Sequence, residues 1–112
     1  MTTDQKLTVF ALASQILAAA KATENDKFAV HTQFSFGHSH TFGKELYCLS
    51  VSLMKKGENG EIVRNEDGVG ESYESEECPN IYICCSEIYE DNCFEKMMEE
   101  MKKAAAKFGI IC

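Results

Sequence analysis

Two histidines separated by one residue are the first candidates for chemistry in this sequence. His38 and His40 lie in the segment 37–43, Gly-His-Ser-His-Thr-Phe-Gly. Side chains two apart in an extended backbone point the same way, so both imidazoles could bind one transition metal, with Glu45, Cys48 or another subunit completing the site. Two ligands do not make a zinc site, and we therefore favour a polar hairpin tip over a metal centre.

The cysteines are numerous but lack metal-binding spacing. There are six of them, at positions 48, 78, 84, 85, 93 and 112. Cys84 and Cys85 would be adjacent on a strand and face opposite sides, so they cannot easily share one metal. The first residues, Met-Thr-Thr-Asp, lack the basic start of a signal peptide, and we expect a cytoplasmic protein or one acting inside a host cell. In that compartment reduced, buried thiols are the default.

A catalytic pair is not indicated by the sequence. Pairing the two strands on either side of the histidine loop puts His31 across from Ser50 and diagonal to Cys48. No carboxylate follows on that face to orient the imidazole, as an activated serine or cysteine nucleophile requires. We therefore expect a non-enzymatic protein with no catalytic residue and no cofactor.

Negative charge is concentrated in one stretch, residues 58–77, which we call the acidic strip. The strip contains eight acidic residues and one base, Arg64, so it accounts for the whole formal net charge of −7. Elsewhere ten acids balance ten lysines. We do not expect direct binding of nucleic acid, because phosphate contacts need clustered Lys and Arg.

Two interpretations of the acidic strip stay open. A solvated loop of this kind would keep the protein soluble. Alternatively, dense negative charge steers association with a Lys- and Arg-rich cleft on a protein partner, and such clefts belong mostly to proteins that handle nucleic acids. An aromatic side chain among the acids could act as an anchor. The residues predicted to contact the partner are Glu66, Asp67, Glu71, Tyr73, Glu74, Glu76 and Glu77.

Two helices are predicted, one near each end of the sequence. Residues 2–21 begin with a capping box, Thr2 with Gln5. Apolar residues lie on both sides of this helix, so either the fold wraps it or a partner covers its second face, and we expect a homo-oligomer, in the simplest case a homodimer. The last helix is capped by Asp91 and ends at Gly109.

Alternation of apolar and polar residues predicts three strands and one weaker strand. The strands are expected at 28–36, 45–55 and 81–89, with the weaker one at Ile62 and Val63. Pairing the first two strands across a loop at 37–43 sets Phe34 opposite Tyr47, so that the large apolar residues share one face.

The other face of this hairpin carries small, mildly polar side chains and no formal charge. Its members are Ala29, His31, Gln33, Ser35, Leu46, Cys48, Ser50 and Ser52. A sheet face open to water usually carries Lys, Glu or Arg. We therefore expect the chain's own helices or loop to cover this face, with an interface for another chain as the alternative.

These elements predict one α+β domain over residues 1–112. It has an antiparallel sheet of three to four strands with an N-terminal and a C-terminal helix, in the order α-β-β-(β)-β-α. The order is similar to that of the double-stranded-RNA-binding domain, but that family places a Lys-rich patch at the start of its last helix, where this chain has Asp-Asn-Cys-Phe-Glu at 91–95. The resemblance therefore carries over no function.

The leading hypothesis is a non-enzymatic, acidic protein-interaction module. In size and charge the chain resembles small acidic phage proteins that block host nucleases, including anti-CRISPR inhibitors. That resemblance, which is one of type rather than of motif, implies an inhibitor docking on a basic, nucleic-acid-binding surface of its target. The alternatives are a small metal- or ligand-binding domain using His38 and His40, or a structural homo-oligomer subunit.

Overall fold

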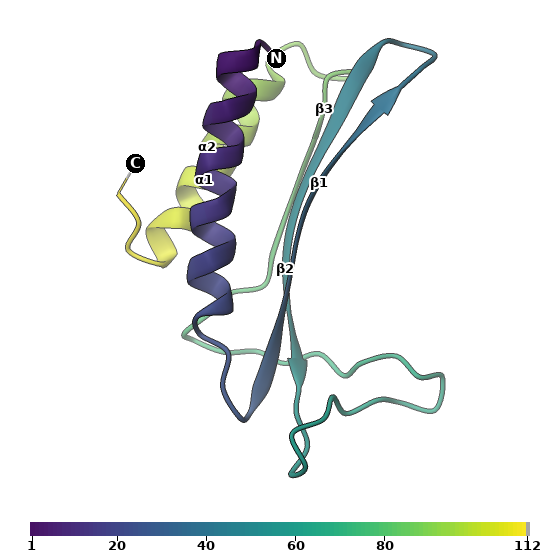
Figure 1. Ribbon diagram of the computed structural model, residues 1–112, viewed down its shortest axis with the longest axis vertical. Coiled ribbons are helices and arrows are strands. Elements are labelled where there is room, and N and C mark those ends of the chain that lie inside the picture. Colours follow the sequence, from purple (N-terminus) through teal and green to yellow (C-terminus); the bar gives the residue numbers. More distant parts are fainter. Residues whose placement is uncertain (112) are drawn as a thin grey trace.

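Two helices bracket a three-stranded antiparallel sheet in the chain order α-β-β-β-α, which confirms the predicted α+β class (Figure 1). The computed structural model describes residues 1–111. The elements are α1 (Thr3–Lys21), β1 (Phe28–Ser39), β2 (Lys44–Lys55), β3 (Ile81–Ser86) and α2 (Cys93–Lys107).

Both helices pack on one face of the sheet, whose strand order is β1-β2-β3 (Figure 1). Helix α1 lies against β1, α2 lies against β3, and the helices also contact each other. The core between these two layers is fully buried at Val9 and Ile16 of α1, Leu49 of β2, and Met97 and Met101 of α2. Within the part of the chain that is described, neither helix is long and apolar enough to cross a membrane.

Local hydrogen bonds explain where α1 begins and show how α2 differs from expectation. The Thr2 hydroxyl accepts from the Gln5 N–H at 3.1 Å, and the Gln5 side-chain oxygen accepts from the Thr2 N–H at 2.9 Å, which is the predicted capping box. Helix α2 has Asn92, not Asp91, at its N-cap, without a side-chain cap hydrogen bond. Its start is shifted because the preceding residues form a turn, in which the Glu90 N–H donates to the Ser86 carbonyl at 3.0 Å.

The β1–β2 hairpin has the predicted faces but not the predicted register. Phe36, rather than Phe34, lies opposite Tyr47. The shift arises because β1 continues for three residues beyond Phe36 into the predicted loop, ending at Ser39. Gly43 closes the shorter turn, since its N–H donates to the Ser39 carbonyl at 2.7 Å and its φ is 65°. A shift of two residues leaves every side chain on its expected face.

The weak strand predicted at Ile62 and Val63 does not join the sheet. The backbone there makes only isolated bridges, such as that between Lys56 and Ile62. The sheet of the described chain therefore has three strands. Strand β3 is also shorter than predicted and ends at Ser86, where the turn before α2 begins.

Two leucines on β2 test which face of the sheet carries the core. We expect Leu49→Ala to lower the free energy of unfolding by about 2–5 kcal/mol, because the side chain is fully buried against the helices. Leu46→Ala is the matched control: this leucine is 41% exposed, and its loss should change the free energy by about 0.5 kcal/mol. Urea titrations followed by circular dichroism would measure both, and equal losses would contradict the assignment of the faces.

Candidate functional site

The acidic strip leaves β2 and returns to β3 through two tight turns, the projecting loops at the bottom of Figure 1. In the first turn the Gly57 N–H donates to the Glu61 carbonyl at 2.8 Å, and in the second the Asn65 N–H donates to the Val69 carbonyl at 2.9 Å. The Asn65 side-chain oxygen also accepts from the N–H groups of Asp67 and Val69. These local hydrogen bonds give the strip a defined path without a regular strand.

Further contacts tie the acidic strip to the sheet. The Lys55 N–H of β2 donates to the Glu71 carbonyl at 2.8 Å, and the Tyr73 N–H donates to the Leu53 carbonyl at 3.0 Å. The half-buried Tyr73 ring stacks on Phe28 of β1, with the ring centroids 5.1 Å apart. Tyr73, predicted as an anchor for a partner, therefore holds the strip against the core, and one face of its ring is already covered.

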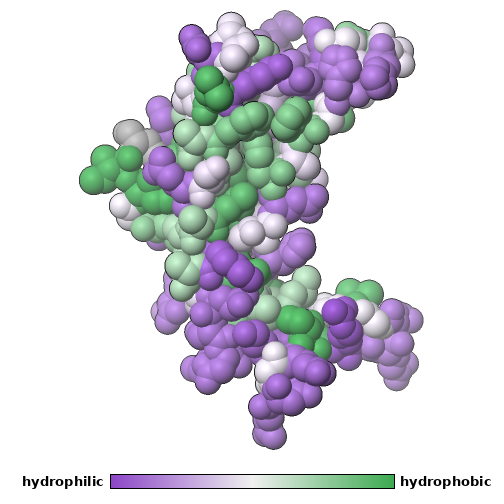
Figure 2. Space-filling view, viewed as in Figure 1, coloured by the Kyte–Doolittle hydropathy of each residue, from purple (hydrophilic) through white to green (hydrophobic). Residues whose placement is uncertain are grey.

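All eight carboxylates of the acidic strip are exposed. None of them forms an ion pair within the described chain, whereas elsewhere Glu24 pairs with Lys21 and Glu90 with Lys96. The one base of the strip, Arg64, donates instead to a backbone carbonyl of its own turn at 2.9 Å. The strip therefore presents negative charge that the chain does not neutralise, and hydrophilic atoms dominate the lower part of the molecule in Figure 2.

The predicted contact residues of the acidic strip fall into two groups. Glu66 and Asp67 lie in the second turn, between the hydrogen-bonded Asn65 and Val69. The others lie on the path back to β3: Glu71, Tyr73, Glu74, Glu76 and Glu77. Sequence reasoning overlooked Val69, which is 58% exposed among the acids. An apolar side chain within a polar rim is a common feature of interfaces, but a single valine gives no periodic signal in a sequence.

Comparison with known proteins does not place this chain in a family. No protein-family model matches it, and neither a curated protein sequence nor a solved structure does. What the site can do must therefore be derived from its own residues.

The two histidines at the hairpin tip lie with their ring centroids 5.5 Å apart. Glu45, which is opposite His38, has its carboxylate engaged: it accepts from the Tyr47 hydroxyl and pairs with Lys6 at 3.1 Å. The hydrogen bond from Tyr47 and then that from Lys6 hold the pKa of Glu45 below its usual range. In the described chain no three His, Cys, Asp or Glu side chains come together to hold a metal, so His40 and His38 lack a third ligand.

His31 does not have the neighbours that the sequence predicts. Because of the two-residue shift in register it lies opposite Ser52 rather than Ser50, and Cys48 lies opposite Ser35. The shift moves His31 away from Cys48 along the hairpin. It therefore removes the histidine–thiol neighbour pair that the predicted register would create.

The expectation that the chain's own helices or loop cover the second sheet face is wrong for most of that face. Both helices lie on the same side of the sheet (Figure 1). This is the face that carries the fully buried Leu49. The acidic strip covers only one end, where Gly70 and Ile62 lie against Met54. Elsewhere the uncharged face is open, and Tyr82 is 74% exposed on it.

This open face brings together two cysteines that lie on different strands. Cys48 of β2 and Cys84 of β3 are direct cross-strand partners. The Glu87 N–H donates to the Glu45 carbonyl in the same pairing, and because antiparallel pairs alternate, the two cysteines form a closer, non-hydrogen-bonded pair. Burial and then the Cys84 thiol raise the pKa of Cys48. The sequence does not predict this pair, because β2 and β3 are joined by the long acidic strip and no short turn fixes their register.

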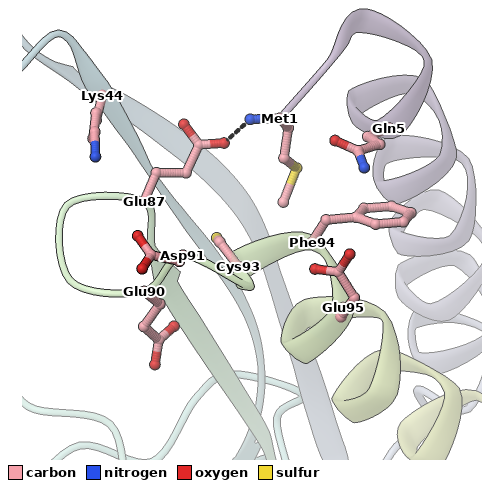
Figure 3. A pocket seen from close by; sticks show the side chains of 9 residues that line it. All are labelled: Met1, Gln5, Lys44, Glu87, Glu90, Asp91, Cys93, Phe94 and Glu95. Carbon is pink, nitrogen blue, oxygen red and sulfur yellow. Dashed lines mark hydrogen bonds and ion pairs between the residues drawn. The ribbon is translucent and has the colours of Figure 1, made fainter.

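A cavity of about 280 Å³ opens between the start of α1 and the connection from β3 to α2 (Figure 3). The Met1 amine pairs with Glu87 there, and Glu90, which also lines the cavity, pairs with Lys96. Cys93 in the wall is buried, and this burial raises the pKa of its thiol, so it is a poor nucleophile at neutral pH. The cavity is thus lined by several carboxylates and by the Cys93 thiol, which is not activated.

The cysteine pair on the open face generates a prediction about oxidation. Oxidised glutathione should react first with the exposed Cys84, releasing one reduced glutathione. Burial raises the pKa of Cys48 and slows its attack, but Cys48 lies directly across from Cys84 and should therefore displace the second glutathione to form a Cys48–Cys84 disulfide. The expected Cα separation of such a pair, ~4.5 Å, lies within the ~4.4–6.8 Å that a disulfide spans. Peptide mapping without reductant would detect the link.

The buried thiols serve as an internal control for this experiment. Burial raises the pKa of Cys85 to about 12, so Cys85 should stay reduced under the same conditions. Cys84→Ser should abolish the cross-link. A disulfide that joins Cys85 to Cys93 while Cys48 and Cys84 stay reduced would contradict the cross-strand assignment.

Proposed function

We propose that this chain is a non-enzymatic protein-interaction module whose acidic strip docks on a basic surface of a partner protein. The observation that carries the proposal is the absence of any ion pair, in the described chain, at the eight exposed carboxylates of residues 58–77. Carboxylates that the chain does not neutralise are available to neutralise a partner.

The electrostatic attraction to a partner depends on the number of charges in the strip rather than on any one ion pair. An exposed ion pair contributes only about 0.2–1 kcal/mol. Eight carboxylates on one projecting segment add their fields, which raises the rate of encounter with a positively charged cleft and disfavours acidic partners. The backbone hydrogen bonds from Lys55 and Tyr73 hold the segment in place, so less conformational entropy is lost when it docks.

The partner proposed is a protein that handles nucleic acid, since Lys- and Arg-rich clefts are typical of such proteins. The chain would occupy a cleft of that kind as an inhibitor, like the small acidic phage proteins that it resembles in size and charge. A cytoplasmic setting with reduced thiols belongs to the same proposal. So does a homodimer, in which each copy presents one acidic strip.

Charge reversal at four positions tests the docking. We expect Glu71→Lys, Glu74→Lys, Glu76→Lys and Glu77→Lys together to abolish capture of the partner from native lysate, because attraction becomes repulsion at the same surface. The four side chains are exposed, so the variant should unfold at the same urea concentration as the wild type. Capture by the wild type should also be lost when the salt is raised from about 0.05 to 0.5 M.

A second quadruple variant separates the acidic strip from net charge. Changing Asp26, Glu95, Glu99 and Glu100 to Lys alters the net charge of the chain by the same amount at exposed sites outside the strip. This control should still capture the partner. Equal loss of capture in both variants, or undiminished capture by the strip variant at physiological salt, would overturn the proposal.

A further inference from the structure

Strand β1 is an edge strand, and most of its outer edge has no partner. The Lys56 N–H of the neighbouring segment donates to the Lys27 carbonyl, and the alternation of an antiparallel ladder then turns the N–H and C=O of even-numbered residues of β1 away from β2. In the described chain these outward groups have no hydrogen-bond partner at Thr32, Phe34, Phe36 and His38.

The first part of the same edge is capped by the chain itself. The Phe28 N–H and C=O bond to Asn25, both at 3.3 Å. The Val30 N–H donates to the Glu24 carboxylate at 2.7 Å, and the Val30 carbonyl accepts from the Lys21 ammonium at 3.1 Å. The open part of the edge is therefore bounded: it begins after Val30 and ends where β1 ends, at Ser39.

An apolar groove of about 260 Å³ runs beside this open edge, between α1 and β1. Phe10 of α1 contacts both Phe34 and Phe36, with the ring centroids 5.3 Å apart in each pair. Phe36 is nevertheless 53% exposed. Figure 2, drawn in the same view as Figure 1, shows apolar atoms gathered over the helix and sheet, above the hydrophilic strip.

The groove continues onto an uncharged stripe of α1. Leu7, Ala11, Ser14 and Ala18 lie on one side of the helix by their spacing, and all four are exposed. This is the second face that the sequence predicts to need a cover. Its small side chains allow another helix to approach within the ~8–10 Å of ordinary helix packing.

We propose that a second copy of this chain pairs its β1 with this edge, antiparallel and about a two-fold axis at Ser35, to form a six-stranded sheet. Phe34 of one copy then lies opposite Phe36 of the other, and Thr32 opposite His38. This register satisfies all four open residues of each copy and forms about eight hydrogen bonds between the copies. It also brings the Phe34 and Phe36 rings of both copies together in one cluster over the axis.

Charge and symmetry favour a second copy over another occupant. The segment from Phe28 to Phe42 has no Asp, Glu, Lys or Arg, so it can meet itself without repulsion although the whole chain carries −7. The acidic strip lies at the Phe28 end of β1, where Ser72 bridges Met54. Antiparallel pairing places the two strips at opposite ends of the shared sheet. The inference does not rest on the docking proposed for the strip.

Sedimentation velocity over about 1–100 µM tests the assembly. The wild type should sediment as a dimer of the 12.5 kDa chain. Phe36→Lys should weaken the dimer at least about 100-fold, because the symmetric interface loses two buried rings and gains two charges. Tyr82→Lys is the matched control, an exposed aromatic on the opposite edge strand, and should leave the dimer unchanged.

Cross-linking tests the register and remains informative if Phe36→Lys does not fold. Cys48 lies opposite Ser35 within one chain, so it is first replaced by serine to prevent an internal disulfide. In this Cys48→Ser background, Ser35→Cys should form a disulfide between the two copies across the axis. Gln33→Cys should not, because its two copies would lie on the order of 14 Å apart along the strands.

Two outcomes would overturn the inference. One is a wild type that stays monomeric throughout the concentration range, which would favour a strand of another protein as the partner of the β1 edge. The other is a dimer that survives Phe36→Lys and forms no Ser35→Cys cross-link, which would place the interface on another surface. A monomeric wild type would also remove the homodimer from the proposed function, but neither outcome bears on capture of a partner by the acidic strip.

Discussion

Burial of one side of the central strand β2 is the constraint on which the rest of the structure depends. The side chains concerned are at most 1% exposed: Tyr47, Leu49, Val51 and Leu53. Both helices pack on the face that these side chains form. Because strand residues alternate, burying this set sends the intervening residues, Cys48 among them, to the opposite face. A slip of one residue would expose the whole core set, so the two faces are strongly specified. The uncharged open face and its pair of cysteines follow from this constraint.

Charge is segregated into one segment, so the molecule consists of an acidic strip and a body without net charge. The acidic strip holds the entire net charge, and the remaining helix–sheet body is formally neutral. A body with the same charge spread over its surface would repel a second copy from every direction. Here the repulsion is confined to one projecting segment, which Tyr73 attaches at the Phe28 end of β1. The self-association and the docking that we propose are therefore compatible in one chain.

The sequence predicts the elements better than their relative placement, for physical reasons. The capping box at Thr2 and the alternation in β1 and β2 are local signals that a short stretch contains in full. The hairpin register depends instead on turn length, and glycines at both 37 and 43 fit a long or a short turn. The absence of charge on a sheet face does not say what lies over it: here the acidic strip covers one end, and the rest of the face is open. Tyr73 looks like a surface anchor because its partner, Phe28, is distant in sequence. The exposed Val69 gives no signal at all.

The outer edge of β1 is protected by charged side chains in its first part and unprotected from Thr32 to His38. At Val30, Glu24 and Lys21 bond the outward backbone groups and also pair with each other at 2.8 Å. The pKa of Glu24 is lowered, chiefly by Lys21 and then by the Val30 N–H, so the cap stays charged at neutral pH. Natural sheets protect free edges with such charges or with proline. From Thr32 to His38 neither is present. A strand that is capped at its first two outward positions and left bare at the next four is suited to pairing at the bare positions.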